Sequence, residues 1–338
     1  MKYDFISIGD VTTDAFIKLK NASVWNDAGI EKLCMNFGDK LEYEKVDIIH
    51  GVGNSANAAV ASARVGLNTA IITNIGKDER GSSAKQIWQN EKISLEFVTE
   101  HEDIPTHYHF IMRFGAERTI LIKHENWPYL LPQFPEAPKW IYFSSIGEGK
   151  EHFHHEVAEF IKANPNTKLA FQPGTFQITL GIKKIKKLYQ NTEIFFCNKE
   201  EAERILALEE NIPQTQSSTE HIINLIKLIQ KNGPKIVVIT DGPRGAFAGN
   251  QNAQFYHIPM YPDIAPPKDR TGAGDAFSST VVAFLAKGMP LEDALLRGPI
   301  NSMNVVQHIG AQAGLLSTDE IERLLQSAPA GYNITTIA

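Results

Sequence analysis

The chain has 338 residues, of which 43% are hydrophobic and 21% are charged, so it is long enough to bury a large core and has the composition of an ordinary globular protein. Its formal net charge of −6 argues against broad nucleic-acid binding, which needs clustered positive charge. Two cysteines are too few for a disulfide framework and no apolar run approaches the roughly 20 residues that span a bilayer, so we expect a cytoplasmic protein that binds neither nucleic acid nor membrane.

Short β-branched or aromatic runs alternate with helical stretches along most of the chain. The helical stretches include residues 54–65, 152–162, 200–208 and 221–230. Such alternation predicts a mostly parallel sheet covered by helices on both faces, with ligands bound at the carboxyl ends of the strands. The predicted buried strands are YDFISIG, TAIITNIG, KWIYFSSIG, KLAFQPG, EIFFCN and KIVVITDG.

Two stretches, residues 13–50 and 105–124, break this alternation. They contain DAFIKLK, KLEYEKVDII, THYHFIMRF and RTILIKHE, most of which look like antiparallel strands, with FGAER as a hairpin turn. We expect them to form a small β-sheet lid beside the core. Within the lid, His107 and His109 alternate on one strand face, which points either into the cleft or into solvent.

The lid divides the rest of the chain into a discontinuous core. We expect residues 1–12, 51–104 and 125–330 to form a Rossmann-like α/β core that binds nucleotide and substrate. The last residues, 331–338, are expected to be a loose tail.

The stretch DRTGAGDAFS, residues 269–278, carries the clearest chemistry. Gly272, Ala273 and Gly274 stand at the start of a predicted helix, where unpaired N–H groups and the helix dipole favour an anion. Asp275 follows in the first turn, where a carboxylate could take a proton from a hydroxyl that attacks a phosphoryl group. Taken alone, the same letters are equally compatible with a tight turn and a helix cap.

The longer pattern D-x-T-G-A-G-D-x-F resembles the signature of the ribokinase-like (PfkB) family of carbohydrate kinases. The resemblance extends over nearly the whole chain, and it implies a ribokinase-like three-layer α/β/α sandwich with a mostly parallel central sheet and a small β-sheet lid. The other segments similar to family motifs are ISIGDVTTDAF, GVGNSANAAVASARVG, NIGKDERG, NKEEAE, TDGPRGA and HIGAQAG.

The resemblance implies an ATP-dependent kinase that transfers the γ-phosphoryl group to a hydroxymethyl group of a sugar. Asp275 would be the base, and the main-chain amides of the Gly272–Gly274 turn would form the anion hole. Asp14, Gly53 and Asn57 match positions that hold the sugar. Arg113, near the lid hairpin, is expected either to meet an acidic or phosphorylated substrate or to be a surface charge.

The nucleotide side of the site is also implied by the resemblance. Glu201 matches the position that organises Mg²⁺, through water, and Asp269 with Thr271 match that of a monovalent cation such as K⁺. Family members often dimerise through their lids, so a homodimer through the lid is expected here. The residues expected to bind the nucleotide are Asn198, Thr240, Gly242, Gly245 and Gly310.

Two departures from the family pattern leave the acceptor open. Val52 precedes Gly53 where the family usually has two glycines, and Gln172 stands where many sugar kinases have an acidic residue. A nucleoside kinase of the same family is the main alternative, with Phe16, Trp25 or Phe110 stacking on a base.

Two alternatives to a kinase are a dinucleotide-dependent dehydrogenase and a non-catalytic sugar-binding protein. GVGNSA also fits a dinucleotide-binding fingerprint, but the next strand ends in Thr73 and Asn74, without the acidic residue that would hold a ribose. A non-catalytic sugar-binding protein would have no need of a base at the phosphoryl site.

Overall fold

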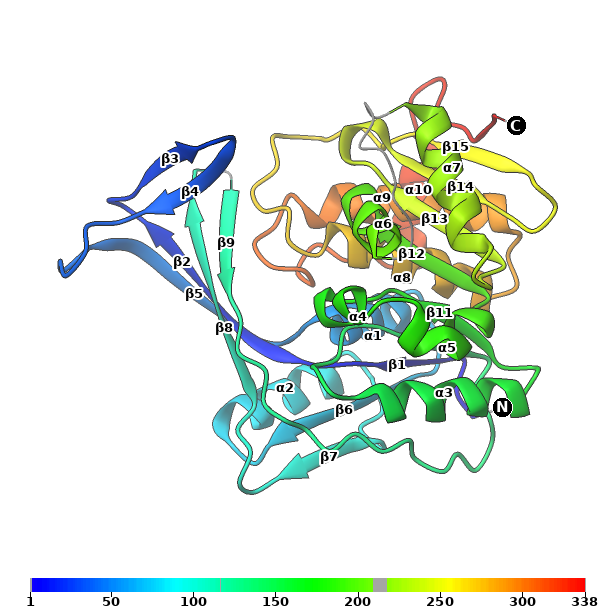
Figure 1. The fold of residues 1–338 in the computed structure, drawn as a ribbon, viewed down its shortest axis with the longest axis horizontal. Coiled ribbons are helices and arrows are strands. Elements are labelled where there is room, and N and C mark those ends of the chain that lie inside the picture. The colour runs from blue at the N-terminus through cyan, green and yellow to red at the C-terminus, as the bar shows by residue number, and fades with distance from the viewer. Residues whose placement is uncertain (1, 116, 209–217, 338) are drawn as a thin grey trace.

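The computed structural model describes residues 2–115, 117–208 and 218–337. Its centre is a ten-stranded sheet in the order β16-β15-β14-β13-β12-β11-β10-β1-β6-β7 (Figure 1). The strands from β13 to β7 run parallel, and β14, β15 and β16 continue the sheet antiparallel. Their bounds are β1 (Phe5–Ile8), β6 (Thr69–Gly76), β7 (Val98–His101), β10 (Trp140–Phe143), β11 (Lys168–Phe171), β12 (Ile194–Asn198), β13 (Ile236–Thr240), β14 (Ala246–Gly249), β15 (Phe255–Ile258) and β16 (Thr335–Thr336).

The parallel strands are apolar on both faces because both faces are covered. In β1, Ile6 and Ile8 belong to one hydrophobic cluster, whereas Phe5 belongs to a second cluster on the other side of the sheet. Successive side chains of a strand point to opposite faces, so a strand shared by two cores must be hydrophobic throughout. The six predicted strands are all confirmed.

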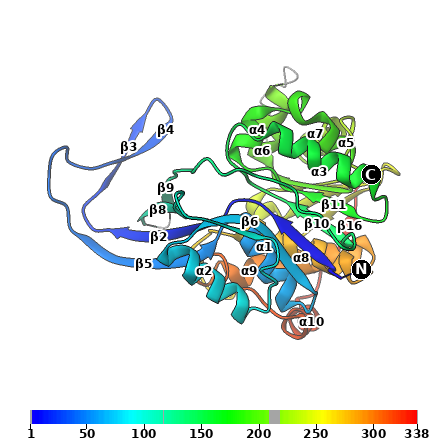
Figure 2. The same cartoon turned by 90° about the horizontal axis from the view of Figure 1, so that it is seen from below.

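Helices cover both faces of this sheet, which gives the predicted three layers (Figure 2). One face carries α1 (Asn54–Arg64), α2 (Glu79–Asn90), α8 (Ala273–Ala286), α9 (Leu291–Val305) and α10 (Thr318–Gln326). The other carries α3 (Glu151–Ala163), α4 (Thr175–Leu180), α5 (Lys186–Gln190), α6 (Lys199–Ala207) and α7 (Thr219–Gln230), with the short turns η1 (Lys183–Ile185) and η2 (Gly242–Arg244) in the connections. Among the described residues, no helix has the length and apolar character needed to cross a membrane.

The two insertions form a separate four-stranded sheet, the lid, in the order β5-β2-β8-β9. Its strands are β2 (Thr12–Leu19), β5 (Tyr43–Val52), β8 (His107–Phe114) and β9 (Glu117–Leu121). The central β2–β8 pair is parallel, unlike the antiparallel pairing that we expected, because the two strands come from different insertions and no hairpin joins them. The predicted β8–β9 turn includes Ala116, which lies outside the described residues. A further hairpin, β3 (Ser23–Asp27) with β4 (Ile30–Cys34), extends from the lid (Figure 1).

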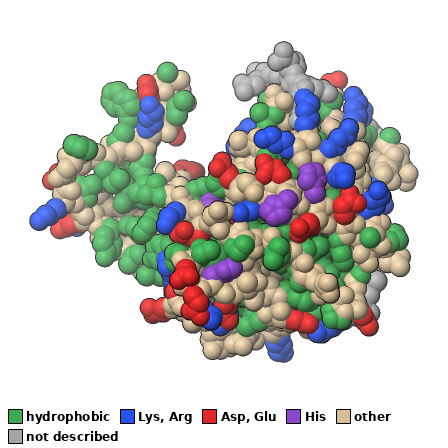
Figure 3. Space-filling view, turned by 60° about the horizontal axis from the view of Figure 1, so that its bottom comes forward, with side chains coloured by type: hydrophobic (Ala, Val, Ile, Leu, Met, Phe, Trp, Pro, Cys, Tyr) green, Lys and Arg blue, Asp and Glu red, His purple; other side chains and the backbone are tan. Residues whose placement is uncertain are grey.

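The two faces of the lid differ in character. Residues in register across β2, β8 and β9 share a face, so Asp14, His109 and Arg113 point to one side, and Arg113 reaches the core there. The outer face carries Ile48, Phe110 and Leu121, which are about half exposed. Figure 3 shows hydrophobic side chains gathered over the lid.

The end of the chain differs from the loose tail that we expected. Residues 335–336 form β16, which pairs with β15 at the edge of the sheet, and the Ile337 N–H donates to the Phe255 carbonyl at 2.9 Å. The Tyr332 hydroxyl donates to the Leu296 carbonyl at 2.6 Å. An edge strand offers unpaired main-chain groups to any nearby segment, and the short polar tail has no sequence pattern that reveals this pairing. Ala338 lies outside the described residues.

Candidate active site

The carboxylate of Asp275 is the centre of a polar cluster at the start of α8. It is 8% exposed and accepts hydrogen bonds from three amide side chains: Asn57 at 2.8 Å, and Asn54 and Gln172 at 3.0 Å each. Burial raises the pKa of Asp275, and the three amide donors act against that rise. A carboxylate with a raised pKa, held in one orientation, is well suited to take a proton.

A second set of hydrogen bonds fixes these amides. The Gln312 amide nitrogen donates to Asn57 Oδ1 at 3.1 Å and to the Gly51 carbonyl at 2.9 Å. Gln172 Oε1 accepts from the Ser278 hydroxyl at 2.9 Å. The sequence singled out Asn57 as a sugar-binding residue and Gln172 as a departure from the family pattern. It did not predict that Asn54, Asn57 and Gln172 bind Asp275, because these residues come from distant parts of the chain.

The small residues before Asp275 form the turn that begins α8. Gly272 is the N-cap residue with φ 81°, and a Cβ placed on it would lie 2.2 Å from the Cβ of Ala311. A Cβ on Gly274 would meet no neighbouring atom within 4 Å. Gly272 therefore satisfies a backbone requirement, whereas Gly274 leaves open space in front of the first N–H groups of the helix.

Asp269 ties this turn to the loop around Gly310. Asp269 Oδ1 accepts from the Thr271 main-chain N–H at 3.0 Å and from its hydroxyl at 2.7 Å, and Oδ2 accepts from the Gly310 N–H at 3.0 Å. The two residues expected at a monovalent cation site thus lie together. Gly310, expected to bind the nucleotide, instead lies against the base of the lid, since a Cβ there would be 2.4 Å from Ile49.

Two adjacent cavities meet at this turn. One, of about 270 Å³, is lined by Gly242, Gly245 and Met260. The second, of about 230 Å³, is lined by Asp275 and Glu201. The two share the lining residues Thr240, Arg270, Gly274 and Phe277. Four of the five residues expected to bind the nucleotide line these cavities: Thr240 lines both, Gly242 and Gly245 line the first, and Asn198 lines the second. Gly310 lines neither.

Glu201 combines a structural role with a place in the second cavity. Its carboxylate accepts from the Asn198 N–H at 2.9 Å, and Asn198 Oδ1 accepts from the Glu201 N–H at 2.8 Å, which together form a capping box at the start of α6. Burial raises the pKa of Glu201. The carboxylate oxygens of Glu201 and Asp275 are donors of the kind that Mg²⁺ prefers, so the residues present fit that ion.

Asp14 and His109 lie in register on β2 and β8, with His109 Nδ1 3.6 Å from Asp14 Oδ1. Asp14 Oδ1 and His109 Nε2 are buried and have no hydrogen-bond partner among the described residues. Burial, with a smaller contribution from the charge of Asp269, raises the pKa of Asp14 to about 7. Burial also lowers the pKa of His109 to about 4, so this histidine is neutral at pH 7. Two unsatisfied polar atoms at one place indicate a position where a polar ligand group binds.

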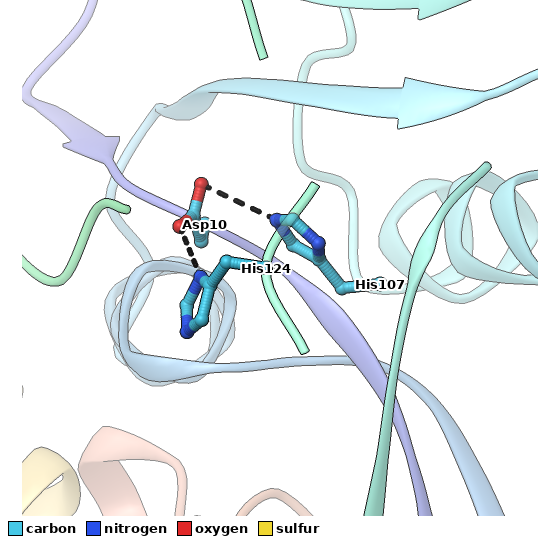
Figure 4. A group of neighbouring side chains, drawn as sticks. All are labelled: Asp10, His107 and His124. Carbon is cyan, nitrogen blue, oxygen red and sulfur yellow. Dashed lines mark hydrogen bonds and ion pairs between the residues drawn. The ribbon is translucent and has the colours of Figure 1, made fainter. Parts of the chain in front are cut away.

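Next to this pair, Asp10 lies between His107 and His124 (Figure 4). His124 Nδ1 is 2.9 Å from Asp10 Oδ2, and His107 Nε2 is 3.6 Å from Asp10 Oδ1. Burial acts to raise the pKa of Asp10, but the interactions with the two histidines and the hydrogen bond from Tyr129 outweigh it and hold this pKa well below its usual range. Sequence reasoning missed Asp10 and His124; the only signal was that Asp10 directly follows β1, at the carboxyl end of the strand.

The three side chains have the donor types of a metal site, with one donor atom from each within 4.8 Å of the others. However, both ring nitrogens of His107 already face N–H groups, of Trp127 at 2.7 Å and of Glu125 at 3.0 Å, and the Tyr129 hydroxyl donates to Asp10. The cluster is therefore explained by hydrogen bonding that joins the lid to the core.

Comparison with known proteins decides the family. The pfkB family carbohydrate kinase profile matches residues 40–319. This chain belongs to the pfkB family. It is 23% identical to the ATP-dependent 6-phosphofructokinase of Thermoanaerobacterium thermosaccharolyticum over 335 residues, covering 96% of this chain and 94% of that one. It is 25% identical to the ribokinase of Staphylococcus aureus over 300 residues, covering 85% and 92%.

Solved structures show the same fold. Arabidopsis thaliana ribokinase complexed with ribose and ATP superposes with a TM-score of 0.80 at 18% identity, covering 96% of this chain and 99% of that one. The nucleoside kinase of Methanocaldococcus jannaschii gives 0.77 at 19% identity, with the same coverage. The expected family, the ribokinase-like fold and the assignment to the carbohydrate kinases are confirmed.

The departures of this pfkB kinase from its family pattern have structural explanations. Val52 is buried and pairs with Thr12, while Gly51 and Gly53 on either side of it have positive φ angles of 66° and 112°. The Gln172 side-chain amide donates to the Asp275 carboxylate at 3.0 Å. Gly51 and Gly53 therefore keep their positive φ angles on either side of Val52. The Gln172 amide faces the Asp275 carboxylate, where many sugar kinases have an acidic residue.

The remaining residues named from the sequence lie in different places. The Arg113 guanidinium donates to the Lys268 carbonyl at 2.7 Å, so it bridges lid and core. Phe16 is buried in the lid, Trp25 lies on the β3–β4 hairpin, and Phe110 is on the outer face of β8. Neither Trp25 nor Phe110 shares the face of Asp14 and His109.

Proposed function

We propose that this pfkB kinase transfers the γ-phosphoryl group of ATP to a hydroxymethyl group of a sugar, with Asp275 as the base. The observation that carries the proposal is the position of the Asp275 carboxylate. It lies in the first turn of α8, lines the second cavity, and is held there by three amide donors. The adjoining first cavity opens beside the same turn and is where the nucleotide would bind.

The chemistry follows from this geometry. The acceptor hydroxyl gives its proton to Asp275 as its oxygen attacks the γ-phosphorus, and the bond to the bridging oxygen of ADP breaks. Negative charge on the transferring group is stabilised by the N–H groups at the start of α8, which the Gly272 turn directs toward the cavity. Asn54, Asn57 and Gln172 keep the carboxylate turned to the acceptor.

ATP is supported as the donor by the shape of the first cavity and by the ATP-bound ribokinase neighbour. Thr240, Gly242 and Gly245 would contact its phosphates. Glu201 would hold Mg²⁺ through water, and the ion would neutralise charge on the β- and γ-phosphates when bound.

A sugar acceptor is supported by the unsatisfied pair in the lid. A hydroxyl group can donate to Asp14 Oδ1 and accept from His109 Nε2 at the same time, so a polyol would satisfy both buried atoms. A nucleoside, the alternative within the family, would need an aromatic surface for its base. Phe110 points to the outer face of the lid and Trp25 lies on the separate β3–β4 hairpin. Phe16 shares the face of Asp14 but is buried, so the unsatisfied polar pair supports a sugar more than a nucleoside.

The test is a phosphorylation assay with ribose, fructose, 2-keto-3-deoxygluconate, adenosine and inosine, in which phosphorus NMR identifies the product. A phosphorylated primary hydroxyl on one of the sugars is expected. Turnover of adenosine or inosine alone would establish the nucleoside alternative instead.

A monovalent cation such as K⁺ is proposed at the Asp269–Thr271 turn, where a carboxylate and a hydroxyl already lie together. Turnover in K⁺ should exceed turnover in tetramethylammonium at equal ionic strength. Equal turnover rates in the two salts would refute the monovalent-cation site.

A homodimer through the lid is proposed from its outer face. The outer face carries the exposed apolar residues Ile48, Phe110 and Leu121. A second copy of the lid would bury this face. Light scattering should show a dimer that Ile48→Asp converts to a monomer, whereas the control Leu130→Asp, at an exposed residue outside the lid, stays dimeric. A monomeric wild type would refute the proposal.

A further inference from the structure

Arginines of the lid face one another beside the active site. Arg113 of β8 and Arg118 of β9 are directly opposite in the antiparallel register and therefore share a face of the lid. Like charges placed directly opposite destabilise a strand pair. Such an arrangement is favourable when an anion binds to that face.

That face is turned toward the phosphoryl site. Arg113 donates to the carbonyl of Lys268, directly before the Asp269–Asp275 stretch. Arg118 lines the second cavity together with Asp275, although the two come from lid and core. Arg270, the variable residue of the D-x-T-G-A-G-D pattern, lines both cavities.

The carboxylates of Asp275 and Glu201 do not form ion pairs with Arg118 or Arg270. Within the described residues, the side chains of Arg118 and Arg270 are exposed and their guanidinium groups form no ion pair or hydrogen bond. Asp275 is occupied by its three amide donors, and Glu201 accepts from the Asn198 N–H in the capping box. Two unpaired guanidinium groups beside one polar cavity indicate an anion of high charge.

We propose that Arg118 of the lid and Arg270 of the core together bind the phosphoryl group in transfer, so that the lid closes on the terminal phosphate of the nucleotide. The inference rests on the proposed function and adds two catalytic residues: Arg118, which lies outside the family motifs, and Arg270, at the variable position of D-x-T-G-A-G-D. A guanidinium fork matches two phosphate oxygens, and the N–H groups of α8 leave the other sides of the phosphoryl group open to such contacts.

A phosphate group on the acceptor is the other source of the same chemistry. The terminal phosphate of the nucleotide fits better, because Arg270 also lines the larger cavity, where the nucleotide would lie. At the inner end of the acceptor site, Asp14 and the neutral His109 supply no positive charge for a second phosphate.

This arrangement would couple lid closure to the state of the nucleotide. With ATP bound, Arg118 has a ligand and draws the lid over the site, which excludes water from the phosphoryl group. With ADP bound, the partner of Arg118 is gone and the lid is released. Arg113 acts as a positioning residue, because its bond to Lys268 holds β8 at the right distance from the turn.

The test compares the affinities of two magnesium nucleotides, ADP and the β,γ-imido analogue of ATP, by titration calorimetry. Arg118→Gln and Arg270→Gln should each weaken binding of the ATP analogue roughly ten- to hundredfold, while ADP affinity stays within about twofold. The control Arg323→Gln, at an exposed residue of α10 outside both cavities, should change neither affinity. Arg118→Lys, which keeps the charge but loses the fork, should fall between wild type and Arg118→Gln.

Other outcomes separate the possible failures. Equal losses for both nucleotides, or no loss for either, overturn the clamp while leaving the proposed kinase intact. An effect confined to KM for phosphorylated acceptors, measured with fructose and fructose 6-phosphate, assigns the arginines to the acceptor and overturns the proposal. A wild type that binds neither nucleotide overturns the proposed function itself. Thermal melting of each variant confirms that it is folded.

Discussion

The substitution Asp14→Asn should stabilise the protein at neutral and alkaline pH while weakening acceptor binding. The Asp14 side chain is 14% exposed, and burial raises its pKa from 3.8 to about 7. For an acid whose pKa is raised on folding, stability is fully present below the unfolded pKa and is lost as pH rises through the folded pKa. The charged carboxylate therefore opposes folding above pH 7.

The size of the effect follows from the two pKa values. One pKa unit is worth about 1.36 kcal/mol, so ionisation of Asp14 costs the folded state roughly 4 kcal/mol at pH 8 and about 2 kcal/mol at pH 5. Asparagine keeps the shape of the side chain and does not ionise. The advantage of Asp14→Asn over wild type in free energy of unfolding should therefore widen by roughly 2–3 kcal/mol between pH 5 and pH 8.

Urea unfolding followed by tryptophan fluorescence at pH 5, 6.5 and 8 measures this difference. Asp10→Asn is the matched control from the same segment. The pKa of Asp10 is held well below the usual range, so Asp10→Asn should be less stable than wild type at all three pH values, which is the opposite sign to Asp14→Asn. A gap between Asp14→Asn and wild type that is constant or shrinks with rising pH would refute the reasoning.

Three further predictions concern the turn, the metal and the acceptor. Gly272→Ala should lower the free energy of unfolding by about 1–3 kcal/mol, because Gly272 has a positive φ and its new methyl group would meet Ala311. Gly274→Ala should fold normally but lose turnover, because its methyl group enters the cavity. Urea denaturation and turnover assays of both variants test this difference. Glu201→Gln should keep the capping box yet need more Mg²⁺ for half-maximal rate, and an unchanged Mg²⁺ titration would contradict this. His109→Phe should raise KM for the acceptor roughly tenfold with nucleotide KM unchanged, as steady-state kinetics can show.

The sequence predicted the core of this fold because its signals are local. Each parallel strand is a continuous apolar run, since both of its faces are buried, and helices alternate with these strands along the chain. The Gly272–Asp275 segment was equally informative, because it is part of the longer D-x-T-G-A-G-D-x-F pattern that resembles a family signature. Neither prediction depended on knowing which distant segments meet.

The features that sequence reasoning missed all depend on long-range pairing. The contacts of Asn54, Gln172 and Gln312 arise only where the start of α1, the loop after β11 and the loop after α9 converge on the start of α8. The parallel β2–β8 pair brings Asp14 opposite His109, which no spacing along the chain reveals. Likewise, the sequence left Arg113 open between contact with an acidic substrate and a place on the surface, and only the β8–β9 register places Arg118 directly opposite it.

The most direct test of the account is the turnover of Asp275→Asn beside wild type, measured as phosphorylated product formed from ATP and the best sugar of the panel. General-base catalysis contributes about 10²- to 10⁴-fold, so the variant should lose turnover by that factor, or roughly 3–5 kcal/mol in activation free energy, while ATP affinity stays near the wild-type value. Turnover within a few fold of wild type would contradict the role assigned to Asp275 and, with it, the proposed mechanism.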